Sequence, residues 1–133
     1  MKSKLSDPNI ALNNMKYIKP LLFALITWLS LSCNSQNCSE LTEVFTNYEQ
    51  AKESIKSTKF SFSDKCNTSK SSWILGAEYY SCDNQIGYFF IVTKKKTYIH
   101  KDLPKEIWEG FKNANSFGKY YNSIIKGKYQ LLL

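Results

Sequence analysis

The sequence contains no arginine, and all 18 of its basic residues are lysines. Arginine supplies the planar, bidentate contacts that recognise phosphates and base edges best, so its absence argues against a dedicated nucleic-acid-binding protein. The formal net charge of +7 also overstates the basic character of the body, because 14 lysines stand against 10 acidic residues from Cys33 onward. We expect this modest excess to be a solvated surface.

Motifs of metal sites and of nucleophilic enzymes are also missing. Histidine occurs once, at His100, and the four cysteines never take the Cys-x-x-Cys spacing of zinc sites. No Gly-x-Ser-x-Gly motif occurs either. We therefore expect a non-enzymatic protein with no metal and no cofactor. Contact between His100 and Cys82 or Tyr98 would be the minimum for acid–base or thiol chemistry, and a cleft joining Cys82 to His100 would indicate it.

The first 33 residues predict an export signal. Lys16 and Lys19 precede the apolar run 21–29, which has the length of a signal-peptide core and is too short for a membrane span of about 20 residues. The run ends at Ser30-Leu31-Ser32-Cys33, which resembles a bacterial lipoprotein signal with Cys33 as the acylated residue. Simple cleavage without a lipid is the alternative, and either Met1 or Met15 is the start.

An acylated Cys33 implies a protein that is secreted across the inner membrane and tethered to the cell envelope, facing the periplasm or on the outer membrane. Its partners would be the membrane, through the lipid, and an envelope component. That compartment permits disulfides. With Cys33 used, Cys38, Cys66 and Cys82 allow one bridge. We expect Cys38–Cys66, which would attach the N-terminal arm to the body, although the pairing stays open.

Residues 34–70 predict a helical arm, a short strand and a loop. Apolar residues recur at helical spacing over 39–57, as one helix or as two segments, 39–45 and 48–57, with Asn47 capping the second. Residues 59–63 alternate in polarity as a short strand does, and residues 64–72 form a polar loop.

Residues 71–133 predict the rest of the fold. Strands are expected over 73–80, with Leu75 and Ala77 on one face, over 86–93, which is apolar on both faces and therefore central, and over 97–100. A helix is expected to start at Asp102, and a second helix over 117–125 to end at Gly127. An extended tail follows. The prediction is an α+β fold: an antiparallel sheet of about four strands with two or three short helices on one face.

Three stretches resemble the KTSC domain, which is named after its occurrence at the C-terminus of some lysyl-tRNA synthetases. These are 71–74, then 98–104, and 114–129, whose Asn115-Ser116-Phe117-Gly118-Lys119-Tyr120-Tyr121 is the most specific part. The family pattern has a central Tyr-x-Tyr, and here that position reads Tyr98-Ile99-His100. The resemblance covers residues 71–129 and implies a small binding module of the KTSC type, for which RNA binding has been suggested.

Six residues are the candidates for a binding surface: Tyr98, His100, Lys119, Tyr121, Lys126 and Lys128. The favoured function is an envelope-tethered, non-enzymatic interaction module. The alternative is an RNA-binding domain, in which these lysines, with 94–96 and Lys101, contact phosphates while Tyr98 or Tyr121 stacks on bases. Lysines gathered on one face would favour that alternative.

Overall fold

A computed structural model of the chain describes residues 37–41 and 44–133. The predicted signal segment and its Cys33 lie outside the described residues. The described elements are, in chain order, η1 (Cys38–Glu40), α2 (Tyr48–Ser57), β1 (Phe62–Cys66), β2 (Ile74–Ser81), β3 (Ile86–Thr93), β4 (Thr97–Pro104), α3 (Lys105–Lys112), α4 (Phe117–Tyr120) and η2 (Tyr121–Ile125). No helix within these described ranges is long and apolar enough to cross a membrane.

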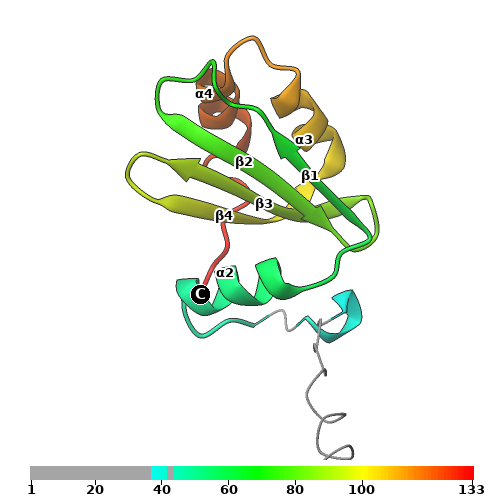
Figure 1. Cartoon of the computed structure of the whole chain (residues 1–133). Helices are drawn as coiled ribbons and strands as arrows, with labels where there is room; N and C mark the ends of the chain where they lie inside the picture. Colours follow the sequence, from blue (N-terminus) through cyan, green and yellow to red (C-terminus); the bar gives the residue numbers. More distant parts are fainter. Residues whose placement is uncertain (1–36, 42–43) are drawn as a thin grey trace, which may run out of the picture. The chain divides into compact units, whose positions relative to one another are not determined.

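The four strands form one antiparallel sheet in the order β1-β2-β3-β4 (Figure 1). The apolar strand β3 lies in the interior of the sheet, paired on both edges, as its sequence predicts. Four consecutive residues of this strand, 88–91, are buried. A strand that is apolar on both faces is stable only where both faces are covered, so β3 lies in the interior of the sheet.

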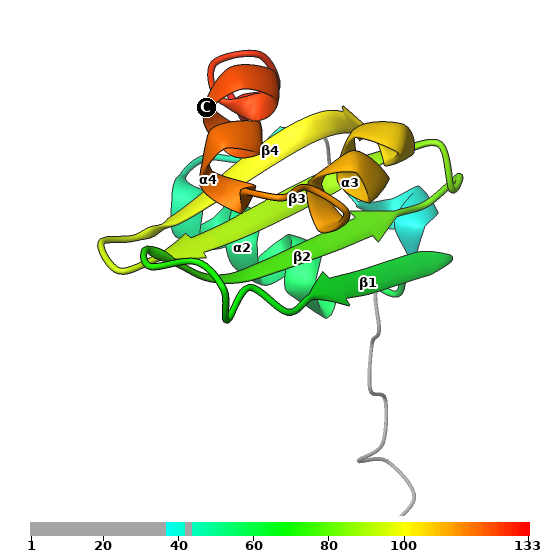
Figure 2. The ribbon, with the colours of Figure 1, turned by 90° about the horizontal axis from the view of Figure 1, so that it is seen from above.

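Helices cover both faces of the sheet, so the prediction that they lie on one face is wrong. Figure 2 shows α3 and α4 on one side of the sheet and α2 on the other. Phe89 packs in a core with residues of α3, α4 and η2, whereas its neighbour Phe90 packs in a second core with residues of α2. Successive side chains of a strand point to opposite faces. The apolar residues on both sides of β3 therefore require a cover on each side, and α2 supplies the second one.

The helix α2 forms as the second of the two segments considered. The side chain of Asn47 accepts a hydrogen bond from the Gln50 amide at 2.9 Å, which makes it the predicted N-cap. Ala51 and Ile55 are fully buried against the sheet. Val44 is 82% exposed, and among the described residues before Asn47 the helical element is the short turn η1.

The predicted start of a helix at Asp102 is wrong, because β4 continues to Pro104. Leu103 is fully buried and pairs with Gly87 of β3. Burial of this leucine holds the chain in the sheet past Asp102, which adopts a positive φ of 57°. The helix α3 begins at Lys105, with Pro104 at its N-cap and no side-chain cap.

Alternation along β2 predicts Leu75 on the same buried face as Ala77, and this is also wrong. The register of β2 against β3 shifts after Ile74. As a result Ile74 is buried in the core with Ala77, while Leu75 is 60% exposed. A bulge reverses the facing of the residues on one side of it, and sequence alternation cannot reveal where it falls.

The second C-terminal helix and the tail form as predicted, with one change. The helix starts after Ser116, but its last part, η2, is a π-helix. Gly127 has a φ of 81°, as expected of a helix-ending glycine. The tail then lies along the open edge of β4, where the Lys101 amide donates to the Tyr129 carbonyl at 2.9 Å.

The disulfide joins Cys38 to Cys82 rather than to Cys66, which corrects the expected pairing. Antiparallel pairing of β1 with β2 places Phe62 opposite Ser81 and Cys66 opposite Ala77. Cys66 and Cys82 therefore lie at opposite ends of this strand pair. The arm reaches the end that carries Cys82, since Asn37 bridges to Lys59, and Cys66 stays free.

Candidate functional site

Four of the six candidate binding residues line one cavity of about 300 Å³, which we name the tyrosine–histidine cavity. They come from separate parts of the chain. β4 contributes Tyr98 and His100, which share a face because they are two residues apart on a strand. Tyr121 comes from η2 and Lys126 follows that helix. The full lining is Tyr48, Trp73, Lys96, Tyr98, Ile99, His100, Tyr121, Asn122, Lys126, Gln130 and Leu131.

His100 lies at the wall of this cavity and is only 2% exposed. Its Nε2 is 3.2 Å from the hydroxyl of Tyr121, and its ring packs against Phe89 at 5.7 Å between centroids. Its Nδ1 has no hydrogen-bond partner among the described residues. The polar groups that influence the buried ring are the Tyr121 hydroxyl and the Tyr129 carbonyl.

Burial controls the ionisation of this wall. It lowers the pKa of His100 to about 4, while the Tyr129 carbonyl opposes part of that shift. Burial also raises the pKa of Tyr121 to about 12. At neutral pH the pair is therefore an uncharged imidazole beside an uncharged phenol, suited to hydrogen bonding and poorly suited to proton transfer.

The charged groups around the cavity are lysines. Lys96 holds its ammonium 4.6 Å from the centre of the Tyr98 ring, and Lys126 is exposed on the other side. None of the described residues that line this cavity is acidic. The cavity is thus aromatic within and positively charged at its edge, an arrangement that favours an anionic ligand.

The remaining candidate lysines lie elsewhere. Lys119 and Lys128 are exposed and do not line the tyrosine–histidine cavity, and Lys128 reaches the Ser123 carbonyl at 3.4 Å. Lys101 lines a different hollow, beside the disulfide. Of the lysines of the RNA hypothesis, Lys96 and Lys126 line the tyrosine–histidine cavity, whereas Lys101, Lys119 and Lys128 do not.

Comparison with known proteins identifies the C-terminal segment. The family model of the KTSC domain matches residues 71–129. The chain carries a KTSC domain. The crystal structure of a KTSC domain protein from Yersinia pestis is 29% identical, over 51% of this chain and 92% of that chain, with a TM-score of 0.44. A search of curated proteins gave no match.

The KTSC segment supplies most of the cavity but not all of it. Trp73, Tyr98 and Tyr121 lie inside the matched range, whereas Tyr48 comes from α2 and donates a hydrogen bond to the Thr97 carbonyl at 2.7 Å. Sequence reasoning did not place Tyr48 or Trp73 at the site. Both arrive through packing between distant elements, and no local pattern signals such contacts.

The position at which the chain departs from the family's Tyr-x-Tyr pattern, His100, therefore lies in the cavity wall of the KTSC domain. No cluster of three or more potential metal-ligating side chains occurs among residues 37–41 and 44–133. His100 is surrounded by aromatic rings rather than by other ligating groups.

Stability is expected to fall as the pH drops from about 6.5 to about 4, because of His100. The pKa of this side chain is 6.5 when unperturbed and about 4 when folded, so the unfolded chain takes up a proton first in that interval. The loss should reach about 2–3 kcal/mol at pH 4. Urea unfolding of the full chain between pH 7 and pH 4 measures it.

Two variants isolate this contribution. His100→Gln should flatten the decline between pH 6.5 and 4. Glu78→Gln should leave the decline between pH 6.5 and about 5.5 unchanged. Burial raises the pKa of Glu78, but hydrogen bonds from Lys56, Tyr80 and Lys65 outweigh it and bring the pKa to about 2. The stability that Glu78 contributes is therefore lost only between about pH 4.5 and 2. An equal decline in the His100→Gln variant would contradict the assignment.

Proposed function

We propose that this chain is a non-enzymatic binding module of the KTSC type, tethered to the bacterial cell envelope, and that the tyrosine–histidine cavity holds its ligand. The observation that carries the proposal is the meeting of Tyr98, His100 and Tyr121 around one cavity that Lys96 and Lys126 also line. The ligand combines a planar ring, which packs on the tyrosines, with an anionic group near Lys96 and Lys126.

The chemistry of the described side chains supports binding rather than catalysis. Cys82 is bound to Cys38, so it offers no thiolate to His100. Cys66 is half-buried, and burial raises the pKa of its thiol. The lowered pKa of His100 makes it a weak base at neutral pH.

Two features support the envelope location. The sequence of residues 15–33 resembles a lipoprotein signal that ends at Cys33. The Cys38–Cys82 disulfide is typical of a protein that folds in an oxidising compartment. A lipid at Cys33 would hold the module at a membrane surface with its cavity in the aqueous phase.

Expression of the full chain and of a Cys33→Ala variant in bacteria tests the tether. We expect the unaltered chain in the membrane fraction, with an intact mass that starts at Cys33 and includes acyl chains. The variant should lose both the acyl mass and the membrane association. A soluble, unprocessed product of the unaltered chain would contradict the proposal, and a processed product without acyl mass would restrict it to simple secretion.

RNA binding is the second candidate, and one observation favours it: Lys96, Tyr98, Tyr121 and Lys126 share one cavity. Tyrosines beside lysines can stack on a base and contact its phosphate. Titration of the full chain with oligouridylate separates the candidates. An RNA-binding domain should bind the oligonucleotide with strong salt dependence. The envelope module should bind a mononucleotide at least as tightly as the oligonucleotide, because only two lysines border the site.

A further inference from the structure

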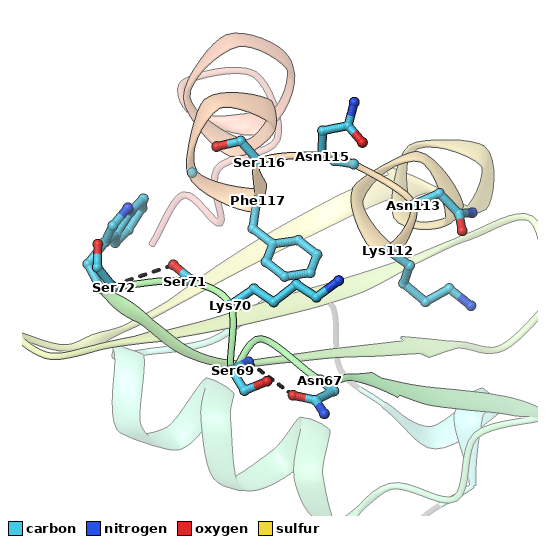
Figure 3. A pocket seen from close by; sticks show the side chains of 13 residues that line it. Asn67, Ser69, Lys70, Ser71, Ser72, Lys112, Asn113, Asn115, Ser116 and Phe117 are labelled. Carbon is cyan, nitrogen blue, oxygen red and sulfur yellow. Dashed lines mark hydrogen bonds between the residues drawn. The ribbon is translucent and has the colours of Figure 1, made fainter.

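A second hollow, of about 580 Å³, lies between the loop that joins β1 to β2 and the junction of α3 with α4 (Figure 3). We name it the serine–asparagine groove. Its lining is Asn67, Ser69, Lys70, Ser71, Ser72, Trp73, Lys112, Asn113, Ala114, Asn115, Ser116, Phe117 and Gly118. Neutral amides and hydroxyls dominate this surface, and none of these residues is acidic. Such a surface suits a ligand rich in neutral hydrogen-bonding groups.

Many of the polar groups in the groove are free to bind. The side chains of Lys70, Ser72 and Asn115 are exposed and make no hydrogen bond or ion pair within the described part of the chain. The amide nitrogen of Asn113 donates to the Glu109 carbonyl, which leaves its oxygen available. The side-chain oxygen of Asn67 accepts from the Ser69 amide, which leaves its nitrogen available.

Only one of the two lysines brings an uncompensated charge. Lys112 is 2.7 Å from Asp64 and 2.9 Å from Glu109, so its ammonium is already paired twice. Lys70 has no such partner among residues 37–41 and 44–133. The groove therefore offers one positive charge within a field of neutral donors and acceptors. A nucleic-acid surface requires several cations along a backbone, and this groove lacks them.

Aromatic rings form the apolar part of the groove. Figure 3 shows the Phe117 ring pointing from α4 toward the loop that carries Lys70. Trp73 forms the end wall and is shared with the tyrosine–histidine cavity. It packs closely on α4, since a Cβ at Gly118 would lie 2.7 Å from its indole nitrogen. A pyranose ring presents the matching surfaces, with C–H groups on one face and hydroxyls around its edge.

We infer that the serine–asparagine groove binds an acidic glycan, with a sugar ring against the half-buried Trp73, hydroxyls and acetamido groups on the asparagines and serines, and one carboxylate at Lys70. This groove shares Trp73 with the tyrosine–histidine cavity, but apart from that wall its serines, its asparagines and Lys70 belong to it alone, so the inference does not rest on the ligand proposed for that cavity. An envelope location would place such polymers within reach, but the geometry of the groove carries the inference.

Nuclear magnetic resonance titration of the full, isotopically labelled chain tests the inference. The probes are a hyaluronan hexasaccharide, the disaccharide of N-acetylglucosamine and N-acetylmuramic acid, neutral chitohexaose and oligouridylate. We expect at least one of the two carboxylate-bearing glycans to bind, with shifts concentrated in residues 67–73 and 112–118. Chitohexaose should bind at least 5-fold more weakly than that glycan.

Substitutions test whether the Lys70 ammonium is the group that binds the glycan carboxylate. Lys70→Gln should weaken the acidic glycan at least 5-fold and bring its affinity close to that of chitohexaose. Lys119→Gln removes one exposed lysine outside the groove and should change the affinity less than 2-fold. Asn115→Ala should weaken both kinds of glycan. Failure of both acidic glycans to bind, shifts outside the groove, or tighter binding of oligouridylate at the groove would each overturn the inference.

Discussion

Gly87→Ala is expected to destabilise the fold by about 2–3 kcal/mol, although it adds a single methyl group. A Cβ at Gly87 would collide with the Tyr80 carbonyl oxygen of the neighbouring strand β2 and lie 2.9 Å from the ring of Tyr79. Neither obstacle can move easily. The carbonyl belongs to the backbone of a central strand pair, and Tyr79 is fully buried, with its hydroxyl donating to the Leu103 carbonyl at 2.9 Å.

Gly76→Ala is the matched control. It lies in β2, and a Cβ there would meet only Val92, at 3.9 Å, which is an ordinary van der Waals contact. Its free energy of unfolding should stay within about 0.5 kcal/mol of the unaltered chain. Urea unfolding followed by circular dichroism measures both. Equal stability of the two variants would show that β2 and β3 do not approach each other at Gly87 as closely as the structure has them.

Cys82→Ser is expected to destabilise the chain by about 2–4 kcal/mol, through loss of the disulfide. The Cys38–Cys82 bridge closes a loop with a sequence separation of 44 residues and joins the arm to the end of β2. Without it, the unfolded chain gains the conformational freedom of that loop. Denaturation in urea under non-reducing conditions measures the change.

Cys66→Ser serves as the control and also tests the pairing. Cys66 is free and half-buried, so its replacement should cost less than about 1 kcal/mol. Alkylation of the denatured, unreduced chain should label Cys66 and leave Cys38 and Cys82 unlabelled until a reductant is added. A larger loss for Cys66→Ser than for Cys82→Ser would restore the Cys38–Cys66 pairing and contradict the structure.

Local patterns in the sequence predicted most of the elements. Asn47 as an N-cap, the buried run 88–91 and Gly127 as a helix end each depend on neighbouring residues alone, and each is confirmed. The α+β class and the KTSC segment follow from the same kind of information. These features could be predicted because the burial pattern of a strand and the capping of a helix each depend on a few neighbouring residues.

The features that sequence could not supply depend on tertiary pairing. The extension of β4 to Pro104 and the disulfide partner of Cys38 are set by the register of strands against one another. At the candidate site, too, local sequence predicted some residues and tertiary packing supplied others. The KTSC resemblance indicated Tyr98 and Tyr121, but the cavity also needs Tyr48, which α2 brings from outside that segment.

A titration with a small aromatic anion tests whether the tyrosine–histidine cavity binds a ligand. The full chain is titrated with 4-hydroxybenzoate and with its neutral counterpart 4-hydroxybenzamide, while the resonances of His100 and Tyr121 are observed. We expect the anion to shift both resonances and to bind more tightly than the amide. Lys126→Gln should weaken binding of the anion about 2–5-fold, whereas Lys128→Gln, outside the cavity, should have no effect. Equal binding of anion and amide, or shifts that bypass His100 and Tyr121, would contradict it.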